Sequence, residues 1–118
     1  MAVKSYTELI AWQKAMDLVE AAYVLSAGFP REELYVTTSQ IRRAAISIPS
    51  NIAEGQGRWN TGEFIHFLGI AHGSLCELET QARIAPRLKF VPETATEPVL
   101  RLAAEVGRLI HGLRNSLS

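Results

Sequence analysis

The stretch Leu34–Gly55, LYVTTSQIRRAAISIPSNIAEG, decides the fold of this chain of 118 residues. Its apolar and small side chains alternate at intervals of four and three residues: Leu34, Thr38, Ile41, Ala45, Ile48 and Ile52. This spacing keeps one side of a helix apolar, so it predicts an amphipathic helix over about residues 32–54. Pro49 lies inside it and cannot donate to the carbonyl of Ala45, so we expect one helix with a kink.

The same periodicity predicts three more helices, over about residues 7–27, 60–84 and 94–117. Short segments rich in glycine and proline separate the four helices, and such short connections make consecutive helices antiparallel neighbours. We therefore predict an all-α protein, an antiparallel up-down-up-down four-helix bundle that forms a single domain over residues 1–118. The expected core positions outside the quoted stretch are Leu9, Trp12, Met16, Val19 and Tyr23, then Phe64, Leu68, Ala71, Leu75, Leu78, Ala82 and Ala85, and finally Val99, Leu102, Val106, Leu109 and Leu113.

Three features predict where the later helices begin and end. Asn60 with Glu63, and Thr94 with Glu97, have the spacing of a capping box, in which the two side chains each accept from a free amide of the first turn. Pro86 is expected to kink or end the third helix near residue 84.

The overall composition excludes several classes of protein. Hydrophobic residues make up 47% of the chain, charged residues 20%, and the formal net charge is zero. These values argue against a disordered chain and against nucleic-acid binding by overall charge. Cys76 is the single cysteine, so neither an intrachain disulfide nor a thiolate metal cluster can form. We expect a cytoplasmic protein, because the sequence contains neither an apolar leader nor a stretch long enough to cross a membrane.

Apolar residues outside the expected core faces raise the question of self-association. They include Ile10, Leu18, Val24, Val36, Ile46, Ile65 and Ile70. They could widen the core of a single bundle, or they could contact further copies of the chain. A second face of the third helix consists mostly of small residues: Gly62, His66, Gly69, Gly73, Cys76 and Thr80. Glycine costs about 1 kcal/mol in a helix, so this face predicts a close contact with another helix.

One side of the second helix is polar and is the candidate functional surface. We call its members the polar face: Gln40, Arg42, Arg43, Ser47, Ser50, Asn51, Glu54 and Arg58. Guanidinium groups among hydroxyl and amide groups could hold phosphates, and Trp59 could stack on a base. Alternatively, Arg42, Arg43 and Glu54 could pair with one another, with Glu77 or Glu79, or across a contact between subunits. The local charge of about +2 over residues 36–61 gives only weak support to nucleic-acid binding.

Metal and catalytic sites are not expected within one chain. Glu63 and His66 have the Glu-x-x-His spacing of di-iron bundles, but the second copy of this motif is missing. His72, Ser74 and Cys76 are expected on different faces of the third helix, so no pair of nucleophile and base is predicted. We expect no metal, no cofactor and no enzymatic activity, unless two subunits build a site between them.

Four runs of residues resemble a known family, that of the four-helix-bundle proteins first found as reading frames in intervening sequences of bacterial 23S ribosomal RNA genes. The runs are Trp12–Ala15, Thr38–Ala44, Ser47–Gly55 and Gly73–Thr80. The resemblance covers about residues 5–82; beyond it, Pro86 and the segment 92–98 depart from the family's uninterrupted third helix and short acidic turn. It implies a homopentameric ring with a central channel. Related accessory proteins of diversity-generating retroelements bind nucleic acid and a reverse transcriptase, but those proteins are strongly basic and this chain is neutral.

Two hypotheses for function follow. In the first, the chain is a non-enzymatic oligomeric scaffold that binds a structured RNA, or an RNA-binding protein, through the polar face. In the second, it is a purely structural oligomer in which the polar face forms the contact between subunits and no nucleic acid is bound. The resemblance names no cellular function that would decide between them.

Overall fold

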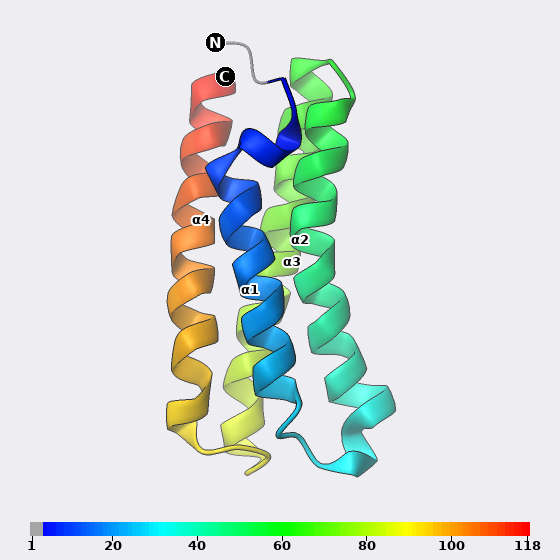
Figure 1. The fold of residues 1–118 in the computed structure, drawn as a ribbon, viewed down its shortest axis with the longest axis vertical. Coiled ribbons are helices and arrows are strands. Elements are labelled where there is room, and N and C mark those ends of the chain that lie inside the picture. Colours follow the sequence, from blue (N-terminus) through cyan, green and yellow to red (C-terminus); the bar gives the residue numbers. More distant parts are fainter. Residues whose placement is uncertain (1–3) are drawn as a thin grey trace.

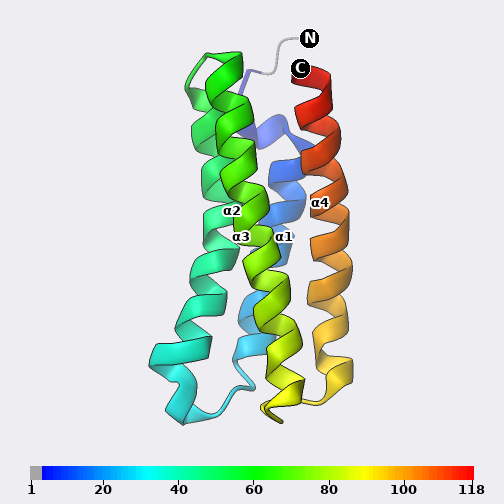
Figure 2. The same cartoon turned by 180° about the vertical axis from the view of Figure 1, so that it is seen from behind.

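The computed structural model describes residues 4–118, and this part of the chain contains helices and no strand. Its four long helices are α1 (Ile10–Ser26), α2 (Ser39–Gly57), α3 (Thr61–Arg87) and α4 (Glu97–Leu117). They lie side by side along a molecule 46 Å long and 24 by 19 Å across (Figure 1). The α1–α2 and α3–α4 connections lie at one end, and the α2–α3 connection lies at the other end (Figure 2). The prediction of an all-α protein is confirmed.

Short, differently wound turns precede three of the long helices. A 3₁₀ turn, Tyr6–Glu8, precedes α1, and another, Glu93–Thr96, precedes α4. The predicted second helix begins with a 3₁₀ turn, Arg31–Glu33, and a π-helical turn, Leu34–Thr38, before α2. A π-helical turn has more residues than an α-helical one, so it breaks the spacing at its start. Leu34 is consequently exposed, and its predicted place in the core is wrong.

The core faces of α2 and α3 follow the prediction closely. In α2 the side chains of Ile41, Ala45, Ile48 and Ile52 are fully buried. In α3 the predicted positions from residue 68 to residue 85 are all buried, and Phe64 packs against them at the margin. The α4 core consists of Val99, Ala103, Val106 and Ile110, while Leu102, Leu109 and Leu113 are half-buried beside it.

The predicted core face of α1 is wrong by one position along most of the helix. The buried side chains are Ala11, Ala15, Leu18, Ala22 and Leu25, again at alternating spacings of four and three. Met16 and Tyr23, assigned to the core, are exposed, and Trp12 and Val19 are half-buried. Alanines on the inner side let α1 lie close to its neighbours, so the larger residues flank the contact.

The helix ends agree with the prediction in part. Asn60 Oδ1 accepts from the Glu63 amide at 2.9 Å, which confirms the cap of α3, but the Glu63 carboxylate pairs with Arg58 instead of reaching back. α3 continues through Pro86 to Arg87, past the predicted end near residue 84. Pro86 lacks the N–H that would donate within α3, and the helix ends one residue later, so little of it lies beyond the proline.

The two remaining predictions about helix geometry have different outcomes. α4 begins at Glu97 behind a 3₁₀ turn, so the capping box predicted at Thr94 and Glu97 is wrong; the Thr96 hydroxyl donates to the Glu93 carbonyl instead, at 2.8 Å. α2 runs as one helix through Pro49. The kink expected at Pro49 stays a prediction.

Candidate functional site

The polar face of α2 does not form one continuous open surface. Four of its members contact the neighbouring helices α1 and α3, and Asn51 and Glu54 bind residues of α2 and its C-terminal cap. Among the described residues, Arg43 and Ser50 are the two members with no side-chain hydrogen bond or ion pair. The sequence brings these residues onto one helix, but the neighbours of that helix determine which of them remain available.

Arg42 points toward α1. Its Nε donates to the Ser26 hydroxyl at 2.8 Å, and its guanidinium lies over the Tyr23 ring, 4.5 Å from the centroid. Ser26 is buried and donates in turn to the carbonyl of Tyr23 at 3.3 Å. A guanidinium that is both hydrogen-bonded and stacked in this way serves the α1–α2 contact, so Arg42 is held against its own subunit.

Ser47 points toward α3, where the hydroxyl groups of Ser47 and Ser74 are 2.8 Å apart. Asn51 Nδ2 donates to the hydroxyl and the carbonyl of Ser47 at 2.9 and 2.8 Å, within α2 itself. Further along, Gln81 Nε2 donates to Gln40 Oε1 at 3.4 Å. The contacts of Ser47 with Ser74 and of Gln40 with Gln81 join α2 and α3, and Asn51 braces Ser47, so these polar groups already have partners within the subunit.

Arg58 forms a small charged cluster at the turn between α2 and α3. It pairs with Glu54 at 2.7 Å and with Glu63 at 3.5 Å, and its guanidinium lies 5.0 Å from the centre of the Phe67 ring. The hydrogen bond that Arg58 donates to Glu54 raises the pKa of Arg58, desolvation lowers it, and the charges of Glu54 and Glu63 raise it further. Glu54 thus pairs with Arg58, and the predicted ion pairs of Arg42 and Arg43 with Glu54, Glu77 or Glu79 are not formed among the described residues.

An open apolar groove lies between α1 and α2 and includes Ser50 of the polar face. This α1–α2 groove has a volume of about 330 Å³ and is lined by Tyr6, Trp12, Met16, Val19, Ile46, Pro49, Ser50 and Ala53. Met16 is 41% exposed and Ile46 is 44% exposed. Two sequence features pointed to this groove: Ile46 lies outside the core face, and α1 carries a second set of large side chains, which was wrongly assigned to the core.

The small-residue face of α3 is fully exposed. Gly62, His66, Gly69, Gly73, Cys76 and Thr80 all lie at the surface. A Cβ added at Gly69 or at Gly73 would meet no atom within 4 Å. The close helix contact predicted for this face is therefore not made within residues 4–118.

The described residues contain no group of three His, Cys, Asp or Glu side chains that could hold a metal ion. The His66 ring lies against Phe67, with ring centroids 5.4 Å apart. His72 and Cys76, expected on different faces, do lie together, since residues four apart share a helix face; Nδ1 and Sγ are 3.9 Å apart and both side chains are exposed. No helix in this part of the chain combines the length and the apolar character that crossing a bilayer requires.

Comparison with known proteins agrees with the resemblance seen in the sequence. The pattern of the 23S rRNA-intervening sequence protein family matches residues 7–112. The chain belongs to this family. As a 23S rRNA-intervening sequence protein, it is similar in fold to a protein of unknown function from the S23 ribosomal protein family of Bacteroides thetaiotaomicron VPI-5482, whose crystal structure was determined at 1.70 Å resolution. The two chains are 22% identical with a TM-score of 0.81, and the match covers 89% of this chain and 98% of that one. No curated protein matches this member of the family.

Proposed function

We propose that this 23S rRNA-intervening sequence protein is a non-enzymatic subunit of a homo-oligomer, an up-down-up-down bundle whose α1–α2 groove receives α3 of the next copy. The observation that supports this proposal best is the groove itself, an open and mostly apolar hollow that includes Ser50. Exposed apolar groups that lie together, such as Tyr6, Met16 and Ile46, mark contact surfaces more often than isolated ones do. Aromatic residues, methionine and arginine are the types enriched where proteins meet.

The small-residue face of α3 is the part of a second copy that fits this groove. Glycines at positions 69 and 73 weaken the helix by about 1 kcal/mol each and fill no close contact inside the subunit. They allow a neighbouring surface to approach the α3 backbone closely. Because the groove and the glycine face belong to different helices of one chain, the contact is head-to-tail, and such a contact forms a ring where the rotation between copies closes and a filament where it does not. The resemblance of the sequence to pentameric bundles sets the expected ring size at five copies.

Arg43 and Ser50 belong to the same contact in this arrangement. They are the two members of the polar face that remain open, and Ser50 lines the groove directly. The contact would therefore bury only the unpartnered part of the polar face, whereas Arg42 and Ser47 hold α2 against its own neighbours.

Light scattering after size-exclusion chromatography tests the proposal. The wild-type protein should have the mass of five 13.0 kDa chains. Ile46→Glu damages the groove, and Gly73→Glu damages the α3 face without a clash inside the subunit; each variant alone should be a monomer. An equal mixture should give dimers and nothing larger, because one intact groove and one intact α3 face remain. Gly112→Glu on α4 is the matched control and should stay pentameric. Oligomers of unchanged size from both contact variants would refute the proposal.

RNA binding is the second candidate function. Its support is an open guanidinium at Arg43 together with Trp59, whose side chain is 94% exposed at the α2–α3 turn. A fluorescently labelled RNA hairpin should bind at low salt, where phosphate contacts are strongest, and Arg43→Ala should weaken binding while the oligomer keeps its mass. Arg58→Ala should have the smaller effect, since Glu54 and Glu63 already neutralise Arg58. No binding of the hairpin at low salt would exclude this function.

A further inference from the structure

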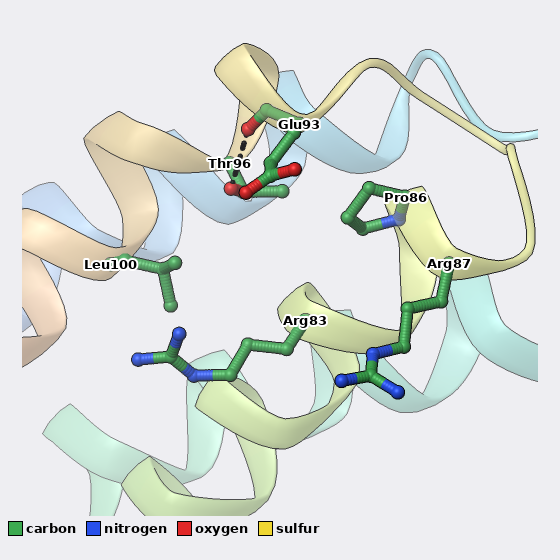
Figure 3. Close-up of a pocket in the computed structure, with 6 residues that line it drawn as sticks. All are labelled: Arg83, Pro86, Arg87, Glu93, Thr96 and Leu100. Carbon is green, nitrogen blue, oxygen red and sulfur yellow. Dashed lines mark hydrogen bonds between the residues drawn. The ribbon is translucent and has the colours of Figure 1, made fainter.

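A second hollow, separate from α2 and from the α1–α2 groove, lies where α3 ends and α4 begins. It has a volume of about 370 Å³ and is lined by Arg83, Pro86, Arg87, Glu93, Thr96 and Leu100. Figure 3 shows Arg83 and Arg87 extending from α3 along one side, with Glu93 and Thr96 on the opposite side and Leu100 at one end. We propose that this hollow binds a small phosphomonoester that carries hydroxyl groups, with its phosphate on the two arginines.

The two arginines are free to take a ligand. Among the described residues, neither guanidinium has an ion pair or hydrogen bond, although Arg58 and Arg101 on the same molecule are both paired. Arg87 lies in the last turn of α3, where a positive charge complements the helix dipole. The effect of the helix dipole falls off within one turn, so it accounts for a positive charge at Arg87 but not for the one at Arg83. It also gives no reason for a hollow between α3 and α4.

The spacing of the arginines favours a phosphate over a carboxylate. Arg83 and Arg87 are four residues apart, and side chains at that spacing lie next to each other on a helix. A carboxylate has two oxygens, which one guanidinium can satisfy through a bidentate pair. A terminal phosphate has three oxygens and nearly two negative charges, so it can accept from both guanidinium groups together.

The opposite side of the hollow specifies the rest of the ligand. The Glu93 carboxylate has no partner among the described residues; only its backbone carbonyl is used, by the Thr96 hydroxyl at 2.8 Å. A carboxylate repels a phosphate and accepts hydrogen bonds from hydroxyl groups. The phosphate therefore lies on the α3 side, a hydroxyl-bearing part lies toward Glu93, and Pro86 and Leu100 contact its carbon atoms. A sugar phosphate has this chemistry.

Isothermal titration calorimetry with ribose 5-phosphate, inorganic phosphate and ribose tests the proposal on the full chain. Ribose 5-phosphate should bind with a Kd of about 1 mM or tighter, and ribose should not bind. Arg83→Gln and Arg87→Gln should each weaken binding about tenfold, the usual effect of losing a hydrogen bond to a charged group. Arg108→Gln, an exposed arginine of α4 outside the hollow, is the matched control and should bind as the wild type does.

Glu93→Gln gives a test of opposite sign. It removes the repulsion, so inorganic phosphate should bind more tightly, while the preference for ribose 5-phosphate over inorganic phosphate should fall. Unchanged melting temperatures without ligand would show that the variants fold. The proposal would be overturned if ribose 5-phosphate gave no saturable heat, or if Arg108→Gln weakened binding as much as Arg83→Gln.

The same phosphate could be carried by a free metabolite or by the 5′ end of an RNA strand. A trinucleotide with a 5′ phosphate should displace ribose 5-phosphate if the hollow accepts RNA ends, and its 5′-hydroxyl form should not. Displacement by both forms alike would mean that the terminal phosphate is not recognised, which contradicts the proposal. This site shares no residue with the α1–α2 groove, so its test and that of the oligomer can fail separately.

Discussion

Gly55 of α2 lies directly against Phe67 of α3, so that a Cβ at position 55 would be only 2.7 Å from the Phe67 Cβ. The same Cβ would lie 3.1 Å from a ring carbon of Phe64. Gly55 is buried, and it is the last residue of the run Ser47–Gly55 that carries the family resemblance. The glycine is required there because Phe64 and Phe67 of α3 leave no room for a side chain at position 55.

Gly55→Ala should therefore destabilise the protein. Alanine is the better helix former, but the clash with the Phe67 Cβ forces a backbone shift, and such overpacking costs about 1–3 kcal/mol. Gly57→Ala is the matched control in the same helix, because a Cβ there meets no atom within 4 Å; it should be neutral or stabilising by up to about 1 kcal/mol. Urea denaturation of both variants checks the prediction. Equal stability of Gly55→Ala and the wild type would contradict the close approach.

Leu18 and Val24 both lie outside the core face that the sequence suggested for α1, yet only Leu18 is buried. Its side chain is fully buried, whereas Val24 is 77% exposed. Leu18→Ala should lower the free energy of unfolding by about 2–5 kcal/mol, the usual range for a leucine removed from a core. Val24→Ala should change it by less than about 0.5 kcal/mol. If thermal melting gave similar losses for both, the orientation of α1 described above would be incorrect.

The error in α1 shows what hydrophobic periodicity can and cannot predict. On α2 and α3 one face carries a continuous series of large apolar side chains, such as Ile48 and Leu68, while those elsewhere, such as Ile46, are isolated, so the pattern identified the buried side correctly. On α1 the inner face is made mostly of alanines such as Ala15 and Ala22, while Trp12 and Met16 lie on the flank. Periodicity shows that a helix has an apolar face, but choosing between two such faces requires the neighbouring helices.

The polar side chains were predictable only where their partners are local. Glu54 and Arg58 are four residues apart, and their ion pair follows from the helix itself. Ser47 meets Ser74 across 27 positions, so this contact depends on how α2 and α3 pack. The hollow with Arg83 and Glu93 was missed for a related reason: it exists only because α3 continues past Pro86 and a short 3₁₀ turn then leads into α4.

Arg42 should prove to be a structural residue. Arg42→Lys keeps the charge but removes both the hydrogen bond from Nε to Ser26 and the planar group over Tyr23, since an ammonium reproduces neither geometry. We expect a loss of about 1–2 kcal/mol in the free energy of unfolding. Arg43→Lys is the control at the adjacent exposed position and should change stability by less than about 0.5 kcal/mol. Chemical denaturation of the two variants at one protein concentration makes the comparison, and equal effects would show that the Ser26 contact does not matter.

Trp59 combines two features that are unfavourable for the stability of the fold, so a contribution to stability does not explain why a tryptophan occupies this position. Its φ of 62° lies in the left-handed region, which costs a residue with a side chain about 1–2 kcal/mol, and its side chain is 94% exposed. Glycine adopts this conformation freely, although it also raises the entropy of the unfolded chain, so Trp59→Gly should stabilise the protein by about 1 kcal/mol or less. Lys89 has a φ of 65° just beyond the end of α3, and Lys89→Gly should give a similar gain in melting temperature.

The two variants should differ in a second measurement. If Trp59 is retained for a contact outside its own chain, Trp59→Gly alone weakens the binding of the labelled RNA hairpin or reduces the mass of the oligomer. A Trp59→Gly protein that melts below the wild type would instead mean that contacts within the subunit hold the indole ring, because a strained and uncovered side chain cannot stabilise the fold that carries it.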